Sequence, residues 1–156
     1  MANIETHGWH VINVLEGPGA PPFSYSIGIY ETLGQPEVIV VGLPHEVAHP
    51  LINDVGDALR GGKRFVPGGV YDDFLEGYDC TFRDVPSRQY WCYLGRAVGH
   101  YGGEDFPVRQ LVYPDREGRW PWDGEAGDGF REQQPVLADT PEPLWAVEIR
   151  RGRQSG

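Results

Sequence analysis

Glycine and proline interrupt this chain at short intervals, with 22 glycines and 14 prolines in 156 residues. Their combined share is about twice the average for globular proteins, and both residues break helices. Helical bundles and coiled coils are therefore excluded. The chain is also 40% hydrophobic and 12% aromatic, which is too apolar for a disordered protein. We predict one loop-rich domain at residues 1–149, followed by a flexible basic tail at residues 150–156.

Three segments in the first third of the chain have strand patterns. Apolar residues alternate with small or polar ones at 9–15 and 23–29, and a turn-rich segment separates the two. Residues 38–43 form an unbroken apolar run, which predicts a central strand buried on both faces. Further strands are expected at 64–66, 78–82, 108–113, 119–122 and 144–149.

Two segments have apolar residues at helical spacing. In the first, these residues recur from Val47 to Leu59. We expect His49 as its N-cap and Pro50 as its first helical residue, because proline fits the start of a helix and clashes inside one. Ser87 is the expected N-cap of the second helix. Together these elements predict an α+β fold, with a mixed, mostly antiparallel sheet and two helices packed on one face.

The net charge of −10 is unevenly distributed. No Lys or Arg precedes Arg60, whereas seven acidic residues do. An acidic surface repels phosphate backbones and anionic lipids, so neither nucleic acid nor membrane is an expected partner. The start of the chain lacks the basic and apolar regions of a secretion signal, which predicts a cytoplasmic protein. Cys80 and Cys92 are then expected to be buried, reduced thiols.

His45, Glu46 and His49 have the HExxH spacing, in which two imidazoles one helical turn apart bind Zn²⁺ and the glutamate activates water. The motif requires a continuous helix through both histidines. Pro50 argues against such a helix, and the expected start at His49 leaves His45 outside it. We therefore expect no metal site and keep a zinc hydrolase only as an alternative.

The most unusual chemistry lies at 109–123, where two tryptophans flank a proline. In an extended segment both indoles would lie on the same side. Paired indoles beside a carboxylate can hold a flat or cationic ligand, although they can equally anchor a hairpin on the core. A long polar loop at 123–139 is expected to cover part of the site. The predicted ligand-binding residues are Tyr25, Gln110, Asp115, Trp120, Trp122 and Asp123.

The leading hypothesis from these residues is a small-molecule or protein-binding module with its site at 120–123. The enzymatic alternatives are the zinc hydrolase and a flavin- or nucleotide-using enzyme. The net charge of −10 suggests a further alternative, in which this protein is an acidic, immunity-type partner that neutralises a basic protein. The sequence predicts no catalytic residue and no particular cofactor or ligand.

Six segments between residues 7 and 137 carry a more specific pattern through their order and spacing. They are 7–9, 25–29, 36–44, 51–54, 110–123 and 134–137. Together they resemble the bacterial domain-of-unknown-function family 4262. The resemblance implies a small bacterial protein without an established activity, and it attaches no role to any residue. The positions that match its motifs are Gly8, Trp9, Tyr25, Gly28, Gly42, Asn53, Gln110, Asp115, Trp120, Pro121, Trp122 and Asp123.

Overall fold

The structure is a computed structural model that describes residues 8–17, 20–75 and 77–140. The strands of this part are β1 His10–Val14, β2 Phe23–Ile27, β3 Glu37–Val41, β4 Val70–Leu75, β5 Tyr78–Asp84 and β6 Val108–Val112. The helices are α2 Ile29–Leu33, α3 His45–Arg60, α4 Tyr90–Tyr93, α5 Gly95–Tyr101 and α6 Asp128–Gln133, with a 3-10 turn at Ser87–Gln89. The predicted strand at 144–149 and the predicted tail at 150–156 lie outside the described residues.

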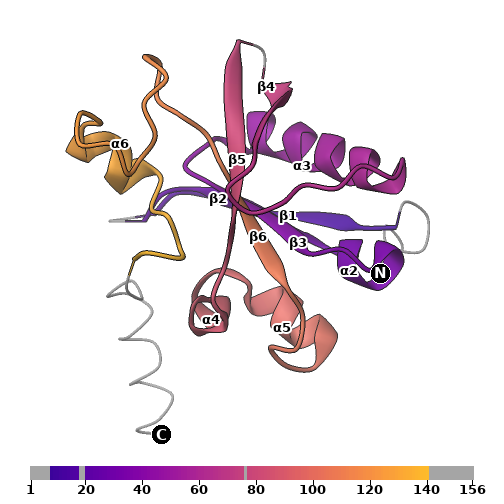
Figure 1. Cartoon of the computed structure of the whole chain (residues 1–156). Helices are drawn as coiled ribbons and strands as arrows, with labels where there is room; N and C mark the ends of the chain where they lie inside the picture. Colours follow the sequence, from indigo (N-terminus) through magenta and orange to yellow (C-terminus); the bar gives the residue numbers. More distant parts are fainter. Residues whose placement is uncertain (1–7, 18–19, 76, 141–156) are drawn as a thin grey trace, which may run out of the picture.

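The strands form one mixed sheet in the order β1-β2-β3-β6-β5-β4 (Figure 1). Among the described strands only β3 and β6 run parallel, with Ile39 opposite Gln110, and all other neighbours pair antiparallel. The sheet therefore consists of two antiparallel three-stranded units, β1-β2-β3 and β6-β5-β4, which meet along β3 and β6. The α+β class and the mixed, mostly antiparallel sheet are confirmed.

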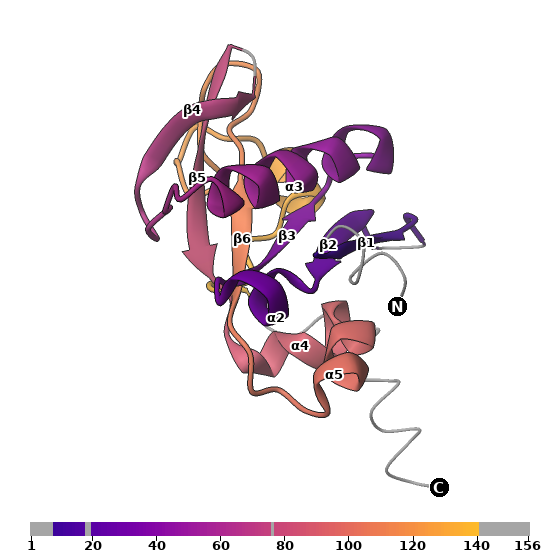
Figure 2. The ribbon, with the colours of Figure 1, turned by 90° about the vertical axis from the view of Figure 1, so that its right-hand side faces the viewer.

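The helices cover both faces of this sheet, with α3 on one side and α4 and α5 on the other (Figures 1 and 2). Ile52 of α3 belongs to the same buried cluster as Val40 of β3. Ile39, the preceding residue of that strand, belongs to the cluster that contains Val98 of α5. The expected placing of both helices on one face is thus corrected. Both β2 and β3 are buried along their whole length, so each face of the sheet centre requires a cover.

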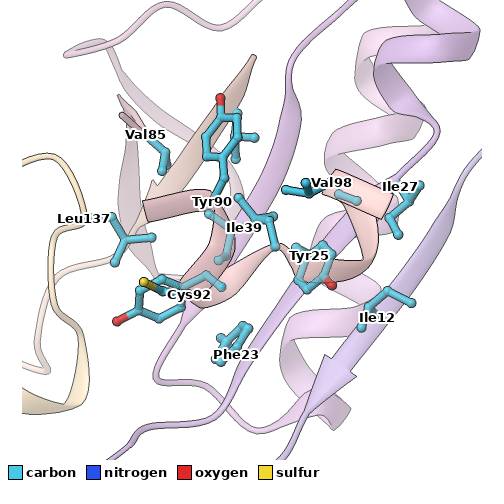
Figure 3. Packing of buried hydrophobic residues seen from close by; sticks show 14 of the residues in the cluster. Ile12, Phe23, Tyr25, Ile27, Ile39, Val85, Tyr90, Cys92, Val98 and Leu137 are labelled. Carbon is cyan, nitrogen blue, oxygen red and sulfur yellow. The ribbon is translucent and has the colours of Figure 1, made fainter. Parts of the chain in front are cut away.

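The cluster under α4 and α5 combines aliphatic and aromatic side chains (Figure 3). The rings of Phe23 and Tyr25 are stacked with their centroids 6.3 Å apart, and Tyr93 meets Phe23 edge to face at 5.0 Å. Cys92 lies in this cluster and Cys80 in the cluster on the opposite face. Both cysteines are buried and neither forms a disulfide, as predicted.

The first long helix, α3, begins at His45 instead of Pro50, with Pro44 as its N-cap. The N–H groups of Val47 and Ala48 donate to the Pro44 carbonyl at 2.9 and 3.0 Å. Pro50 still removes the donor for the Glu46 carbonyl. Because Pro50 and Glu46 are both exposed, water can hydrate that carbonyl, and the helix tolerates the proline. The predicted start at His49 is therefore wrong.

The second predicted helix is broken into the 3-10 turn, α4 and α5. Ser87 lies inside the 3-10 turn, whose N-cap is Pro86. The helical bonding pattern stops at Leu94 (φ −121°, ψ 33°), and Gly95 follows. Glycine has low helix propensity, which explains a break at this point.

Several short elements also differ from the sequence prediction. Residues 64–66 and 119–122 are not strands, whereas β4, α2 and α6 were not predicted. The strand β4 lies at the edge of the sheet and pairs only with β5 among the described strands. All six of its residues are exposed or half-buried, so it lacks the alternation that identifies a strand in the sequence.

Gly56 marks a close approach between α3 and the start of β1. A Cβ atom at this position would lie 2.5 Å from Cζ2 of the buried Trp9 ring. We expect Gly56→Ala to lower the free energy of unfolding by about 1–3 kcal/mol in urea denaturation, because overpacking outweighs the gain in helix propensity. Gly99→Ala in α5 is the control, since no atom lies within 4 Å of its added Cβ. Equal stability changes in the two variants would contradict tight packing of Trp9 on α3.

Candidate functional site

Two of the predicted site residues, Tyr25 and Gln110, lie in the core. Tyr25 is 2% exposed, and its hydroxyl oxygen accepts a hydrogen bond from the Arg96 N–H at 3.3 Å. Gln110 is fully buried: its amide donates to the Pro135 carbonyl at 2.9 Å and accepts from the Leu137 N–H at 2.9 Å. These bonds attach the chain after α6 to the centre of the sheet. Neither side chain lines the clefts described below.

Asp115 and Asp123 each fix a turn around the predicted ligand site. Asp115 accepts from the N–H groups of Glu117 and Arg119 at 3.0 and 2.9 Å and pairs with the Arg119 side chain at 2.9 Å. Although desolvation opposes it, hydrogen bonding from Arg119 and Glu117 lowers the pKa of Asp115. Asp123 accepts from the Trp120 N–H at 2.8 Å. These side-chain bonds replace strand pairing, so residues 119–122 form turns.

The two indoles of this segment are stacked. The rings of Trp120 and Trp122 have centroids 5.5 Å apart and planes that differ by 9°. The guanidinium carbon of Arg83 lies 4.1 Å from the Trp122 ring centroid, which is a cation–π contact. The sequence predicted that the indoles would lie together, and they do, although turns rather than a strand bring them into contact.

Trp120 also lines a cleft of about 420 Å³, which we call the tryptophan cleft. It lies between the β4–β5 hairpin and the turn before Trp120. Its lining residues are Asp72, Leu75, Gly77, Tyr78, Asp79, Pro114, Gly118 and Trp120. The polar groups among them are two carboxylates and a phenol, and no basic side chain is among the described residues that line the cleft. An indole combined with carboxylates is a chemical environment suited to a cation.

Sequence reasoning missed Asp72, Tyr78 and Asp79. A signal was available, because the segment 71–80 contains acidic residues next to tyrosines on both sides of a glycine. It was missed because β4 was not predicted, so nothing placed this hairpin beside Trp120.

The predicted polar loop at 123–139 contains α6, which contacts the backbone of the segment that carries the two tryptophans. Arg131 of α6 donates to the carbonyls of Pro121 and Asp123 at 2.9 and 2.6 Å. Phe130 meets Tyr113 edge to face, with centroids 5.9 Å apart, and does not line the tryptophan cleft. The helix therefore supports the tryptophan segment and does not cover the site.

A second cleft, of about 440 Å³, lies between the start of β1 and one face of α3. We call it the histidine cleft, and its lining residues are Trp9, His10, Val11, His49, Asn53, Asp57 and Arg60. The Trp9 indole N–H donates to Asn53 at 3.0 Å, and the Arg60 guanidinium carbon lies 4.4 Å from the Trp9 ring centroid. Two of the positions that match the family motifs, Trp9 and Asn53, thus contact each other here.

The HExxH motif lies on a continuous helix, so the prediction that Pro50 breaks this helix is corrected. The exposed His45 ring contacts Glu46 at 3.5 Å, whereas His49 Nδ1 lies 3.1 Å from the Asn13 amide nitrogen. Within the described ranges, no three His, Cys, Asp or Glu side chains are grouped so that they could hold a metal ion. The zinc alternative thus has its helix but lacks a third protein ligand in this part of the chain.

A buried carboxylate that was not predicted from the sequence lies at the start of β3. Glu37 is fully buried and accepts hydrogen bonds from the Ser26 hydroxyl at 2.7 Å and from the Tyr101 hydroxyl. It also accepts from the backbone N–H groups of Gly28 and Ile29 at 2.9 and 3.0 Å. Burial raises the pKa of Glu37. This carboxylate joins α2, α5, β2 and β3.

The fold and its clefts define a small α+β domain with an acidic aromatic cleft on one unit of its sheet and a histidine-containing cleft on the other. The chain belongs to the family described as Domain of unknown function (DUF4262), whose sequence model matches residues 3–127. The resemblance stated from the sequence is thereby confirmed. Searches of curated proteins and of solved structures found no match. In the part of the chain that the structure describes, no helix is long and apolar enough to cross a membrane.

Proposed function

We propose that this protein is a single-domain binding module that holds a small organic cation in the tryptophan cleft. The observation that carries the proposal is the position of Trp120, which lines the same cleft as Asp72, Asp79 and Tyr78. An aromatic face and carboxylates are the two groups by which proteins recognise ammonium and guanidinium ions. The volume of about 420 Å³ falls within the range of small-molecule sites.

The stacked tryptophans already make one cation–π contact, with Arg83, and the two carboxylates of the cleft have to offset the repulsion between Arg83 and a bound cation. The Arg83 guanidinium lies 4.1 Å from the Trp122 ring, and Trp122 is stacked on Trp120. This aromatic pair therefore attracts a cation within the protein itself. A ligand that binds beside Trp120 would use the same electrostatic attraction, strengthened by the two carboxylates.

The charge of the whole chain favours the same class of ligand. A net charge of −10 raises the local concentration of cations near the surface, and a groove lined with carboxylates concentrates the field further. In this proposal Asp115, Trp122 and Asp123 hold the segment that carries Trp120, and Tyr25 and Gln110 support the fold. In this proposal the protein acts in the cytoplasm, where buried thiols such as Cys80 and Cys92 stay reduced. The zinc, flavin and immunity-type alternatives lack a comparable observation among the described residues.

Tryptophan fluorescence with three cationic probes tests this function. We would titrate the protein with tetramethylammonium, agmatine and spermidine at constant ionic strength. We expect saturable quenching with at least one probe, because a cation beside Trp120 perturbs its emission. Trp120→Ala is expected to abolish the response, and Asp79→Asn to weaken binding by about 1 kcal/mol, or several-fold in Kd.

Trp91→Ala is the matched control for the loss of an indole. Trp91 is 51% exposed on α4 and does not line the tryptophan cleft. This variant should keep the binding curve of the unmodified protein. The proposal fails if none of the probes gives a saturable response, or if Trp120→Ala and Asp79→Asn bind as tightly as Trp91→Ala.

A further inference from the structure

The histidine cleft has an ordered set of polar side chains that the proposed function does not use. His49, Asn53, Asp57 and Arg60 follow one another along a single face of α3, at spacings of four, four and three residues. Trp9, His10 and Val11 form the opposite wall at the start of β1. The apolar part of this wall is rigid, because Trp9 is 6% exposed and packs against Gly56.

A chain of hydrogen bonds orients the His49 ring. The Ser24 hydroxyl donates to Asn13 Oδ1 at 2.8 Å, which leaves the Asn13 amide N–H groups to donate. The Asn13 amide nitrogen lies 3.1 Å from His49 Nδ1, so Nδ1 is the acceptor. A neutral His49 therefore carries its proton on Nε2 and is a hydrogen-bond donor through that atom.

Two further groups of the cleft are oriented as donors. The side-chain oxygen of Asn53 accepts from the Trp9 indole, so the Asn53 NH₂ group is left to donate. The guanidinium of Arg60 lies over the Trp9 ring at 4.4 Å. It also fits against Gly8, where a Cβ atom would lie 2.5 Å from Arg60 Nη2. Gly8 has φ +96°, a conformation that glycine adopts readily, so the backbone leaves room for this arginine.

The local charge of this cleft differs from that of the protein as a whole. Desolvation lowers the pKa of His10, and the charge of Arg96 lowers it further. Besides its two histidines, the described lining of the cleft carries one basic side chain, Arg60, and one acidic side chain, whereas the whole chain carries a net charge of −10. Asp57 is the one acidic side chain among the described residues that line the cleft, and it is exposed.

We infer that the histidine cleft is a second ligand site, which binds a small organic carboxylate or phosphate. Arg60 supplies the positive charge, and its planar group suits both anions. The His49 Nε2–H and the Asn53 NH₂ group donate to the remaining anionic oxygens. Trp9 and Val11 provide the apolar wall for the carbon part of the ligand. This site is independent of the cation in the tryptophan cleft.

An NMR titration of the full chain tests this site. We would add sodium phosphate or sodium acetate at constant ionic strength, with sodium chloride as the reference, and follow the indole N–H signals in ¹H–¹⁵N spectra. We expect a saturable shift of the Trp9 signal with one or both anions. Arg60→Gln should weaken that binding by about tenfold. Arg116→Gln removes the same charge at an exposed position outside the cleft and should bind as the unmodified protein does.

A second variant covers the case in which Arg60→Gln disturbs the packing of Trp9. His49→Asn keeps a polar group near the position of Nδ1 but has no donor at the position of Nε2, and we expect it to bind several-fold more weakly. A saturable Trp9 shift that both variants weaken supports the site, whichever of the two anions produces it. The inference is overturned if neither anion gives a saturable Trp9 shift beyond that of chloride, or if the folded variants bind as tightly as Arg116→Gln.

Discussion

Replacing Glu37 with alanine is expected to lower the free energy of unfolding by about 3–5 kcal/mol, a larger loss than we expect at Gly56. Glu37 is fully buried, and its carboxylate accepts from Ser26, Tyr101 and the backbone at the start of α2. Alanine leaves these donors without an acceptor, and those of Ser26, Gly28 and Ile29 are buried. Urea denaturation followed by circular dichroism measures the loss, and a change below about 1 kcal/mol would contradict this role of Glu37.

Glu37→Gln is the matched control because it keeps the volume and one acceptor oxygen. We expect an intermediate loss of stability. The comparison also has a predicted pH dependence, because burial raises the pKa of Glu37 in the folded state. At pH values between the ordinary pKa of glutamate and the raised pKa of Glu37 in the folded state, Glu37 keeps its proton in the folded protein and has lost it in the unfolded chain. The free energy of unfolding of the unmodified protein therefore falls as pH rises through this range. The difference in free energy of unfolding between the unmodified protein and Glu37→Gln becomes smaller over the same range.

Replacing Gln134 with alanine is expected to lower the free energy of unfolding by about 2–4 kcal/mol. Its buried side chain accepts from the Tyr113 N–H at 3.0 Å and donates to the Tyr113 carbonyl at 2.8 Å. It pairs with the backbone just after β6 as a neighbouring strand would. Its loss leaves both backbone groups without partners and opens a cavity.

The adjacent residue provides the control for Gln134. Gln133 is exposed, and its amide donates a hydrogen bond to the Gly42 carbonyl at 2.8 Å. We expect Gln133→Ala to cost less than about 1 kcal/mol in the same denaturation experiment. If the two alanine variants lose equal stability, side-chain bonding by Gln134 does not hold residues 133–137 against the sheet.

The long periodic elements could be predicted from the sequence because their apolar patterns reflect burial. The unbroken apolar run at 38–43 corresponds to β3, and the helical spacing from Val47 to Leu59 lies within α3. The sequence predicts too late a start for α3, because proline is unfavourable inside a helix and the solvent exposure of Glu46 and Pro50 depends on the tertiary structure.

The elements that were missed depend on contacts between distant residues. The helix α2 has only five residues, and the acceptor for its first N–H groups is Glu37, which follows the helix in the chain. The turns at 119–122 depend on the side chains of Asp115 and Asp123. Such bonds leave no periodic signal in a sequence.

The same limit applies to the candidate sites. The sequence predicted both indoles on one side of an extended segment, whereas in the structure turns bring them into a stacked pair. Its partners Asp72 and Asp79 come from a hairpin about 40 residues earlier in the chain, and only the β4-β5-β6 order brings them beside Trp120. In the same way, His10 and His49 belong to separate patterns in the sequence, and both line one cleft.

Intermolecular NOEs between bound tetramethylammonium and the protein test the proposed cation site most directly. The methyl protons of this probe are expected to show NOEs to the indole protons of Trp120 and the ring protons of Tyr78, which line the same cleft. Trp9 and Trp91 lie outside that cleft and should show none. If tetramethylammonium does not quench the fluorescence, the probe that does takes its place. NOEs to Trp9 or Trp91 without NOEs to Trp120, or no intermolecular NOE from a probe that quenches saturably, would contradict the cation-binding function.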